Sequence, residues 1–424
     1  MPCLTGSWDG GSVGGKGASG TGTVCQTPDP MDAELPAGFS AHVANVGIKD
    51  DTDDFVVIAA DRPCAAAAVF TRSRFAGPSV EVSRRHVADG SLRAVVVVSK
   101  NANVATGAQG LADAEELVAG VATALDARPD EVLVASTGVI GRPYPMGRIR
   151  AHLRGGLGDV ATAAFPITTA LPAATGIMTT DTHPKVAAAS LRTVDGAMAS
   201  VVGIAKGVGM IEPDMATMLA FVLTDAVVDA SVLDAVFRRV VDRTFNSLSV
   251  DTDTSTSDTA AVLASGLAGP VKPTDLEVAL EAVCLELTRQ LAADGEGAQT
   301  LIVVAVDGAR DDAQAKRVAK AVVNSPLVKT AVHGADPNWG RVAMAIGKCS
   351  DDTDIDQDRV RIRFGDIEVY PSDPGPGGLT DLEGYLHADE VLIGVDLGIG
   401  SGSWTVYGCD LTDGYVRINA DYTT

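Results

Sequence analysis

The sequence is poor in aromatic side chains and in basic residues. Aromatic residues make up only 4% of the 424 residues while 46% are hydrophobic, so the core has to be aliphatic. Lys and Arg number 33 against 55 Asp and Glu, which gives a formal net charge of -22. This balance argues against a nucleic-acid surface, because such a surface needs clustered basic side chains to displace phosphate counterions. It argues equally against docking on anionic lipid.

Paired cysteines and long apolar runs are also lacking. The six cysteines are widely scattered and form no CxxC pair, which argues against a disulfide framework and against a zinc knuckle. No run of about 18 apolar residues occurs, so we expect no membrane span. The N-terminus lacks the basic segment and apolar segment of a secretory signal. We therefore expect a cytoplasmic protein.

The first thirty residues are rich in Gly, Ser and Thr and almost devoid of aliphatic side chains. This composition is typical of a disordered tail, which we place at residues 1–34, with Met31 as an alternative start. Within it, GGSVGGKG at 10–17 nearly matches a phosphate-binding loop. Gly17 stands where that motif has Ser or Thr, and no strand precedes it, so we assign it no phosphate role.

From about residue 35 the pattern alternates between strands and helices, which predicts a layered α/β protein. A helix is predicted over 113–126. A longer one is predicted over 274–295, where Thr274 and Glu277 are spaced as a capping box. Its apolar stripe consists of Leu276, Leu280, Val283, Leu287 and Leu291. Apolar runs that predict buried strands lie at 93–100, 131–137, 217–225, 300–308 and 403–411.

Two motifs that could hold a ligand fail on inspection. Asp251, Asp253 and Ser255 occupy the first three ligand positions of a calcium loop, but its required Gly and terminal Glu are missing. We expect instead a hydroxyl-rich turn that caps a helix over 259–268. The glycines of DLGIGSGS at 396–403 lead into a strand pattern, whereas a dinucleotide loop must open a helix.

The histidines offer no obvious chemistry. The six of them show no metal-ligand spacing, and no GxSxG elbow accompanies them. If the protein is an enzyme, we therefore expect it to use neither a histidine base nor a metal.

Thr217 is a hydroxyl at the head of a predicted buried strand, after the tight glycine turn of KGVGM. Its Oγ can attack the carbonyl of Ala216, and the resulting N→O acyl shift ends in chain cleavage. The new N-terminal threonine carries its own base, because an α-amine with a pKa of about 7.7–8 can take the proton of Oγ. Strand-initial threonines are common, so the residue type alone favours a structural role.

The residues around Thr217 favour the catalytic role. KGVGMIEPDMATML closely resembles the cleavage-site signature of the ornithine acetyltransferase family, also called glutamate N-acetyltransferases. Roughly residues 35 to 424 carry further blocks that resemble this family, in the family's order. DGEGAQT departs from the usual DGEGATK, and KNANVATG is similar to the branch found in clavulanic-acid-type pathways. The other similar blocks are STGVIG, IMTTDTHPK, SVDTDTSTSDT, VKTAVHGADPNWGR and WTVYGCDLTDGYVRINADY.

The resemblance implies a role for individual residues. Thr217 matches the nucleophile, and cleavage of Ala216–Thr217 would divide the chain into an α chain, 35–216, and a β chain, 217–424. Taken by themselves, Lys206 would be a surface lysine and Glu296 a solvated loop acid, but both match substrate-binding positions. The remaining matches are Thr137 and Gly138 for the oxyanion, and Thr179 or Thr180, Asn419 and Thr424 for substrate.

The resemblance also implies a fold and a reaction. The expected fold is a layered α-β-β-α sandwich with a second, smaller α/β domain, and the processed chains are expected to assemble as α2β2. Acetyl would pass from N-acetylornithine to Thr217 and on to glutamate without a metal or organic cofactor, with acetyl-CoA as an alternative donor. Two alternatives stay open: an N-terminal-nucleophile aminopeptidase or amidase, which passes the acyl group to water, and an unprocessed amino-acid-binding protein.

Overall fold

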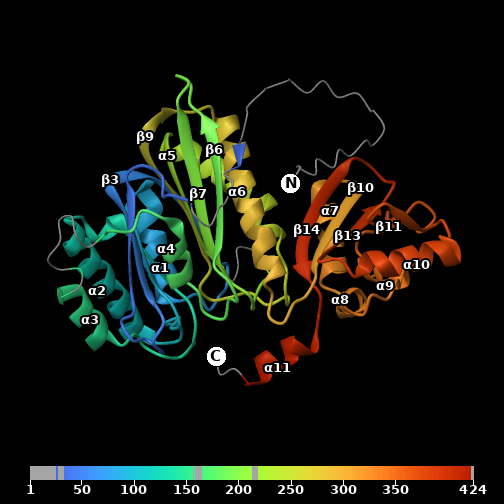
Figure 1. Ribbon diagram of the computed structural model, residues 1–424, viewed down its shortest axis with the longest axis horizontal. Helices are drawn as coiled ribbons and strands as arrows, with labels where there is room; N and C mark the ends of the chain where they lie inside the picture. Colours follow the sequence, from blue (N-terminus) through green and yellow to red (C-terminus); the bar gives the residue numbers. More distant parts are fainter. Residues whose placement is uncertain (1–24, 27–32, 156, 158–164, 213–217, 422–424) are drawn as a thin grey trace.

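The computed structural model describes residues 25–26, 33–155, 157, 165–212 and 218–421. Within these residues two α/β units lie side by side, each built around one sheet (Figure 1). The near-match to a phosphate loop and most of the predicted tail fall outside the described residues. The short strand β1 (Cys25–Gln26) pairs with the edge strand β6 of the larger sheet.

The larger sheet has nine strands in the order β1-β6-β7-β8-β9-β3-β4-β5, with β2 paired to β3. Strand β3 joins its two halves: its beginning pairs with β2 and β4, and its end pairs with β9. The register with β4 shifts between Ala59 and Cys64, around Pro63, as expected where a proline interrupts a ladder. The strands are β2 (Phe39–Ala44), β3 (Phe55–Phe70), β4 (Ser91–Val98), β5 (Val132–Ser136), β6 (Lys185–Arg192), β7 (Met198–Lys206), β8 (Leu219–Val227) and β9 (Thr259–Pro270).

Three apolar clusters show that this unit has four layers. The inner cluster joins side chains of β7 and β8 to side chains of β2 to β5, so the two halves of the sheet face each other. A second cluster covers the outer side of β6 to β9 with α5 and α6, and a third covers β3 to β5 with α2 and α3. The predicted α-β-β-α sandwich is thus confirmed. The helices are α1 (Pro78–His86), α2 (Gly107–Leu125), α3 (Met146–Gly155), α4 (Ala170–Gly176), α5 (Ala230–Arg243) and α6 (Pro273–Ala293).

The smaller unit confirms the second α/β domain. Its sheet has the order β12-β11-β13-β10-β14 and lies beside several helices (Figure 1). A separate apolar cluster joins the sheet to these helices. No helix among the described residues combines the length and apolarity needed to cross a bilayer. The elements are β10 (Leu301–Ala309), α7 (Asp312–Val323), α8 (Pro326–His333), α9 (Trp339–Gly347), β11 (Arg361–Phe364), β12 (Ile367–Tyr370), α10 (Gly375–Leu386), β13 (Glu390–Asp396) and β14 (Gly402–Cys409).

The last helix, α11 (Asp413–Asp421), leaves the smaller unit and returns to the larger one, where Asn419 hydrogen-bonds Glu296. The change from one sheet to the other falls between α6 and β10. The predicted boundary between the α and β chains is a cleaved peptide bond at 216/217. These residues lie outside those that the structure describes, so the boundary stays a prediction.

The predicted strands all occur, with ends that differ by one or two residues, but the helix predicted over 259–268 is wrong. These residues form β9, which is parallel to β8 and antiparallel to β3. Their alanine and leucine content favours a helix locally. Pairing on both sides overrides that preference, because a central strand buried on both faces can be apolar throughout.

Helix α6 carries the predicted apolar stripe, and all five side chains of it are buried. The predicted capping box is wrong, because Pro273 occupies the first helical position and makes Lys272 the N-cap. Glu277 instead bonds Arg239 of α5, with 2.6 Å between Oε2 and Nη2.

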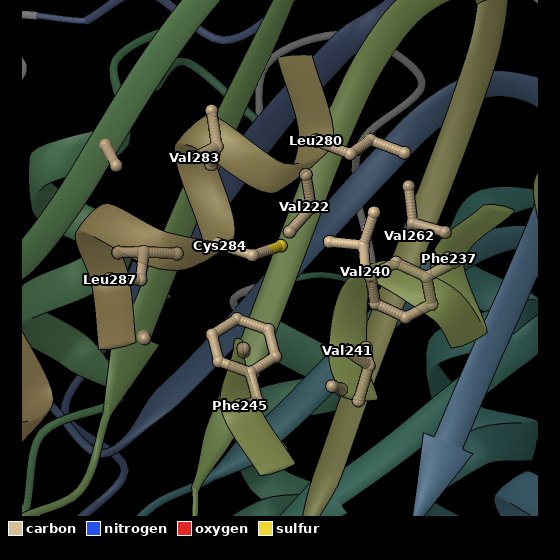
Figure 2. Close-up of a cluster of buried hydrophobic side chains, with 14 of the residues drawn as sticks. Val222, Phe237, Val240, Val241, Phe245, Val262, Leu280, Val283, Cys284 and Leu287 are labelled. Atoms are coloured by element: carbon tan, nitrogen blue, oxygen red, sulfur yellow. The ribbon is translucent and has the colours of Figure 1, made fainter. Parts of the chain in front are cut away.

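The packing of α5 and α6 on the sheet predicts how substitutions in α6 change stability. Leu280 is fully buried beside Val222 and Val262 of the sheet and Cys284 of its own helix (Figure 2). Leu280→Ala should therefore lower the free energy of unfolding by about 2–5 kcal/mol, through lost burial and the cavity left behind. Urea denaturation, monitored by circular dichroism, measures this free energy of unfolding.

The same helix supplies the control. Val278 is 52% exposed, so Val278→Ala should change stability by less than about 0.5 kcal/mol. Equal losses in the two variants would show that α6 does not pack as described.

Candidate active site

One cavity of about 240 Å³ collects the described candidate residues from distant parts of the chain. It lies where β5 and β7 end and where α11 returns to the larger unit. Ala216, Thr217 and Thr424 lie outside the described residues. The candidates that line the cavity are Thr137, Gly138, Thr179, Thr180, Lys206, Glu296 and Asn419.

Lys206 is the last residue of β7 and is only 5% exposed. Its Nζ donates to Thr137 Oγ1 at 3.0 Å. Burial lowers the pKa of this ammonium, while the carboxylate of Asp181 acts in the opposite direction. Because the oxygen of Thr137 accepts from Lys206, the hydroxyl hydrogen of Thr137 remains available for another acceptor.

Gly138 follows Thr137 with a backbone that no other residue adopts easily. Its φ is 123°, and a Cβ at this position would lie 2.3 Å from the carbonyl carbon of Lys100. The residue after β5 must therefore be glycine for the chain to run this close to Lys100.

Glu296 comes to the cavity from the loop after α6. Its backbone N–H donates to the carbonyl of Val208 at 2.9 Å, and its Oε2 accepts from Asn419 Nδ2 at 2.7 Å. Burial raises the pKa of the Glu296 carboxyl, and the nearby Asp251 adds to the effect, against the hydrogen bond from Asn419. The carboxylate lies against Gly209, where a Cβ would be 2.6 Å from Oε2, so the second glycine of KGVGM leaves room for it.

Asp251 and Tyr415 are among the lining residues that were not predicted as site residues. Asp251 accepts hydrogen bonds from the backbone N–H groups of Met210 and Ile211, at 2.6 and 2.7 Å, and so holds the chain that follows Lys206. The pKa of Tyr415 on α11 is raised to about 12 by burial and by the charges of Asp251 and Glu296. Both residues lie in blocks that resemble the family, and this resemblance was the signal that could have identified them as site residues. Asp251 by itself looked like a turn residue.

A buried ionic cluster behind the cavity was also missed. Lys185, the first residue of β6, is fully buried between the carboxylates of Asp181 and Asp294. A lysine at the head of an apolar run is the only local sign of it. Nothing in the sequence pattern shows that Asp294, 109 residues further on, meets this lysine.

The lining of the cavity thus combines the ammonium of Lys206 with the carboxyl groups of Glu296, Asp251 and Asp253. Lys206 suits a carboxylate, and Glu296 suits an ammonium, so the pair matches an amino-acid ligand. The volume is below the range of about 300–1,000 Å³ usual for drug-sized ligands, which also favours a small molecule. Among the described residues no group of three or more His, Cys, Asp or Glu side chains is arranged to hold a metal ion.

The backbone of Gly138 generates a stability prediction. Gly138→Ala would combine a positive φ with the collision against Lys100, whereas Gly141 has a φ of 81° and open space around its Cα. Gly141→Ala should cost about 1–3 kcal/mol for the φ alone, and Gly138→Ala should cost more. Thermal unfolding of the two variants measures the difference, and a Gly138→Ala protein as stable as Gly141→Ala would contradict the close approach.

Comparison with known proteins finds relatives along nearly the whole chain. The ArgJ family matches residues 40–424. Glutamate N-acetyltransferase Oat2 of Streptomyces clavuligerus is 58% identical over 397 residues, which cover 92% of this chain and 98% of that protein. The arginine biosynthesis bifunctional protein ArgJ of Rhodococcoides fascians is 54% identical over 93% of this chain and 96% of its own length.

A solved structure, that of the arginine biosynthesis bifunctional protein ArgJ of Bacillus halodurans, is 44% identical with a TM-score of 0.46, and covers 49% of this chain and 100% of that chain. The resemblance read from the sequence is confirmed by the family match and by relatives that cover nine-tenths of the chain. The prediction of an acyltransferase is confirmed with it. This chain belongs to the ArgJ family.

Proposed function

We propose that this protein moves an acetyl group from N-acetylornithine to glutamate through an acyl-enzyme on Thr217. The observation that carries the proposal is the pairing of Lys206 with Thr137 in a cavity that also holds Glu296. A relative with 58% identity bears the name glutamate N-acetyltransferase. Together they favour an acyl transfer between two amino acids over a general hydrolase.

In the first half-reaction Lys206 binds the carboxylate of N-acetylornithine and Glu296 binds its side-chain ammonium. Thr217 Oγ attacks the acetyl carbonyl carbon, and the α-amine of Thr217 takes the hydroxyl proton. The tetrahedral oxyanion receives hydrogen bonds from the Thr137 hydroxyl and the Gly138 N–H, donors of a kind that contribute about 3 kcal/mol each. The C–N bond then breaks, the proton passes to the departing nitrogen, and ornithine leaves an acetyl ester on Thr217.

In the second half-reaction the α-amine of glutamate attacks the ester carbonyl. The same donors hold the second oxyanion, the C–O bond to Thr217 breaks, and the proton lost by the amine returns to Oγ through the α-amine of Thr217. The acceptor uses Lys206 for its α-carboxylate, as the donor did. The two substrates therefore bind in turn, which is a ping-pong cycle.

The proposal includes the processing of the chain. Cleavage of Ala216–Thr217 frees the α-amine that serves as base, and the α and β chains then assemble as α2β2 in the cytoplasm. Strand β8 starts at Leu219, which pairs with Lys206, so the first residue of this strand lies beside a residue that lines the cavity. No metal or organic cofactor enters this cycle, and acetyl-CoA is an alternative donor to be assayed.

Glutamate dependence tests the proposed function directly. Purified, processed protein is given N-acetylornithine with and without glutamate, and both ornithine and N-acetylglutamate are quantified. Release of ornithine beyond one equivalent per active site should require glutamate and should match N-acetylglutamate in amount. Turnover that is independent of glutamate would show that the protein is an amidase and would contradict the proposal.

Thr217→Ala tests the nucleophile and the cleavage site together. This variant should run as one uncleaved chain on a denaturing gel and should lose acetyl transfer, because both the hydroxyl and the later α-amine are missing. Thr274→Ala, at an exposed position of α6, is the matched control and should give two chains and full activity. Two fragments from Thr217→Ala would refute the assigned bond.

A further inference from the structure

The buried cluster behind the cavity joins three segments of the chain through one ammonium. Lys185 Nζ donates to Asp181 Oδ1 at 2.8 Å and to Asp294 Oδ2 at 2.6 Å. Lys185 is fully buried, and the two carboxylate side chains are 0% and 3% exposed. Because water is excluded, each charge of this cluster depends on the other two.

Asp181 links the cluster to two substrate-binding segments. Its Oδ1 also accepts from the backbone N–H of Gly207 at 2.7 Å, next to Lys206. Its Oδ2 accepts from the backbone N–H of Thr179 at 3.1 Å. One carboxylate therefore fixes the turn that carries Thr179 and the point where β7 ends.

Asp294 links the cluster to the third segment. It is the C-cap of α6 and stands two residues before Glu296. Its Oδ2 accepts from the backbone N–H of Thr182 at 3.1 Å, and its Oδ1 accepts from the hydroxyl of Thr182. The loop that presents Glu296 is thereby tied to the same turn as Thr179.

The cluster also sets the charge balance at Lys206. Burial lowers the pKa of this ammonium, and the ammonium of Lys185 lowers it further. Three carboxylates oppose this: Asp181 most strongly, then Asp258 and Glu296. Asp181 is therefore the carboxylate that most favours the charged form of this buried ammonium, which itself donates to the neutral hydroxyl of Thr137.

We propose that Asp181, Lys185 and Asp294 form a positioning triad: Asp181 keeps Lys206 protonated for the substrate carboxylate, and Lys185 with Asp294 holds the Glu296 loop against the Thr179 turn. The proposal rests on the proposed function in that Lys206 and Glu296 grip an amino acid. It differs from a purely structural role, because a buried ion pair adds little stability over apolar residues of the same size.

Two isosteric variants separate the two parts of the proposal. Asp181→Asn removes the main charge that opposes deprotonation of Lys206, so the titration midpoint of Lys206 should move to lower pH. Asp294→Asn removes a carboxylate that is not among the main charges acting on Lys206. That midpoint should therefore stay, while binding of L-ornithine weakens about tenfold, as for one lost hydrogen bond to a charged group.

A matched control accounts for the general loss of a buried carboxylate. Asp225 near the far end of β8 is 7% exposed and accepts from the backbone N–H groups of Ser200 and Ala37, at 2.7 and 3.3 Å. Asp225→Asn should change neither the Lys206 midpoint nor the affinity for L-ornithine. Thermal unfolding of all three variants identifies any that do not fold.

The midpoint is read from the ¹³Cε resonance of Lys206 in protein labelled with ¹³C-lysine, assigned by its disappearance in Lys206→Met. Affinity for L-ornithine is measured by calorimetry at neutral pH. An Asp181→Asn midpoint equal to that of the Asp225→Asn control would overturn the charge role. If Asp181→Asn does not fold, Asp294→Asn decides: unchanged ornithine affinity overturns the positioning role.

The readouts also separate this proposal from the proposed function. The Lys206 midpoint needs no substrate, so it can shift as expected in a protein that transfers no acetyl group, and then only the function fails. Conversely, a wild-type protein that transfers acetyl to glutamate while Asp181→Asn and Asp294→Asn behave like Asp225→Asn keeps its function and loses the triad.

Discussion

A charged lysine with almost no access to water is the constraint around which the site is arranged. Lys206 ends a strand whose neighbours are apolar, and its ammonium reaches the cavity beside Thr137. Burial alone favours the neutral amine, so the position is useful for binding a carboxylate only where nearby carboxylates favour the charged form. Asp181 meets that need, and Lys185 in turn stabilises Asp181.

The apolar layers make this arrangement rigid. Helix α6 packs its leucine stripe on the sheet and ends at Ala293, so Glu296 enters the cavity from a fixed helix end. The site itself lies outside the four-layer core, between the larger unit and the returning helix α11. Polar contacts such as the hydrogen bond from Asn419 to Glu296 therefore orient the side chains that line the cavity. The aliphatic core fixes the helices and strands from which these side chains come.

The cavity lined by Lys206 and Glu296 is compatible with two amino-acid substrates that bind in turn. An amino acid presents an α-carboxylate whichever side chain it carries, and Lys206 lies where it can bind that common group. In the proposed cycle the variable part would meet Glu296, whose pKa is raised by burial and by Asp251. A carboxyl that gains a proton more readily than usual is less repulsive toward an acidic side chain than a permanently charged one. The geometry is therefore compatible with a basic donor and an acidic acceptor in one cavity.

The sequence by itself determined the layered α/β fold and five of its strands, because an apolar run bounded by turns indicates a strand that is buried on both faces. It also pointed to Thr137, Gly138, Lys206, Glu296 and Asn419, though only through their resemblance to family blocks. Only the tertiary structure decided that 259–268 is a strand, since its pairing with β3 and β8 outweighs local helix preference. It alone joined Lys185 to Asp294, because an ion pair between residues 109 positions apart leaves no periodic trace along the chain.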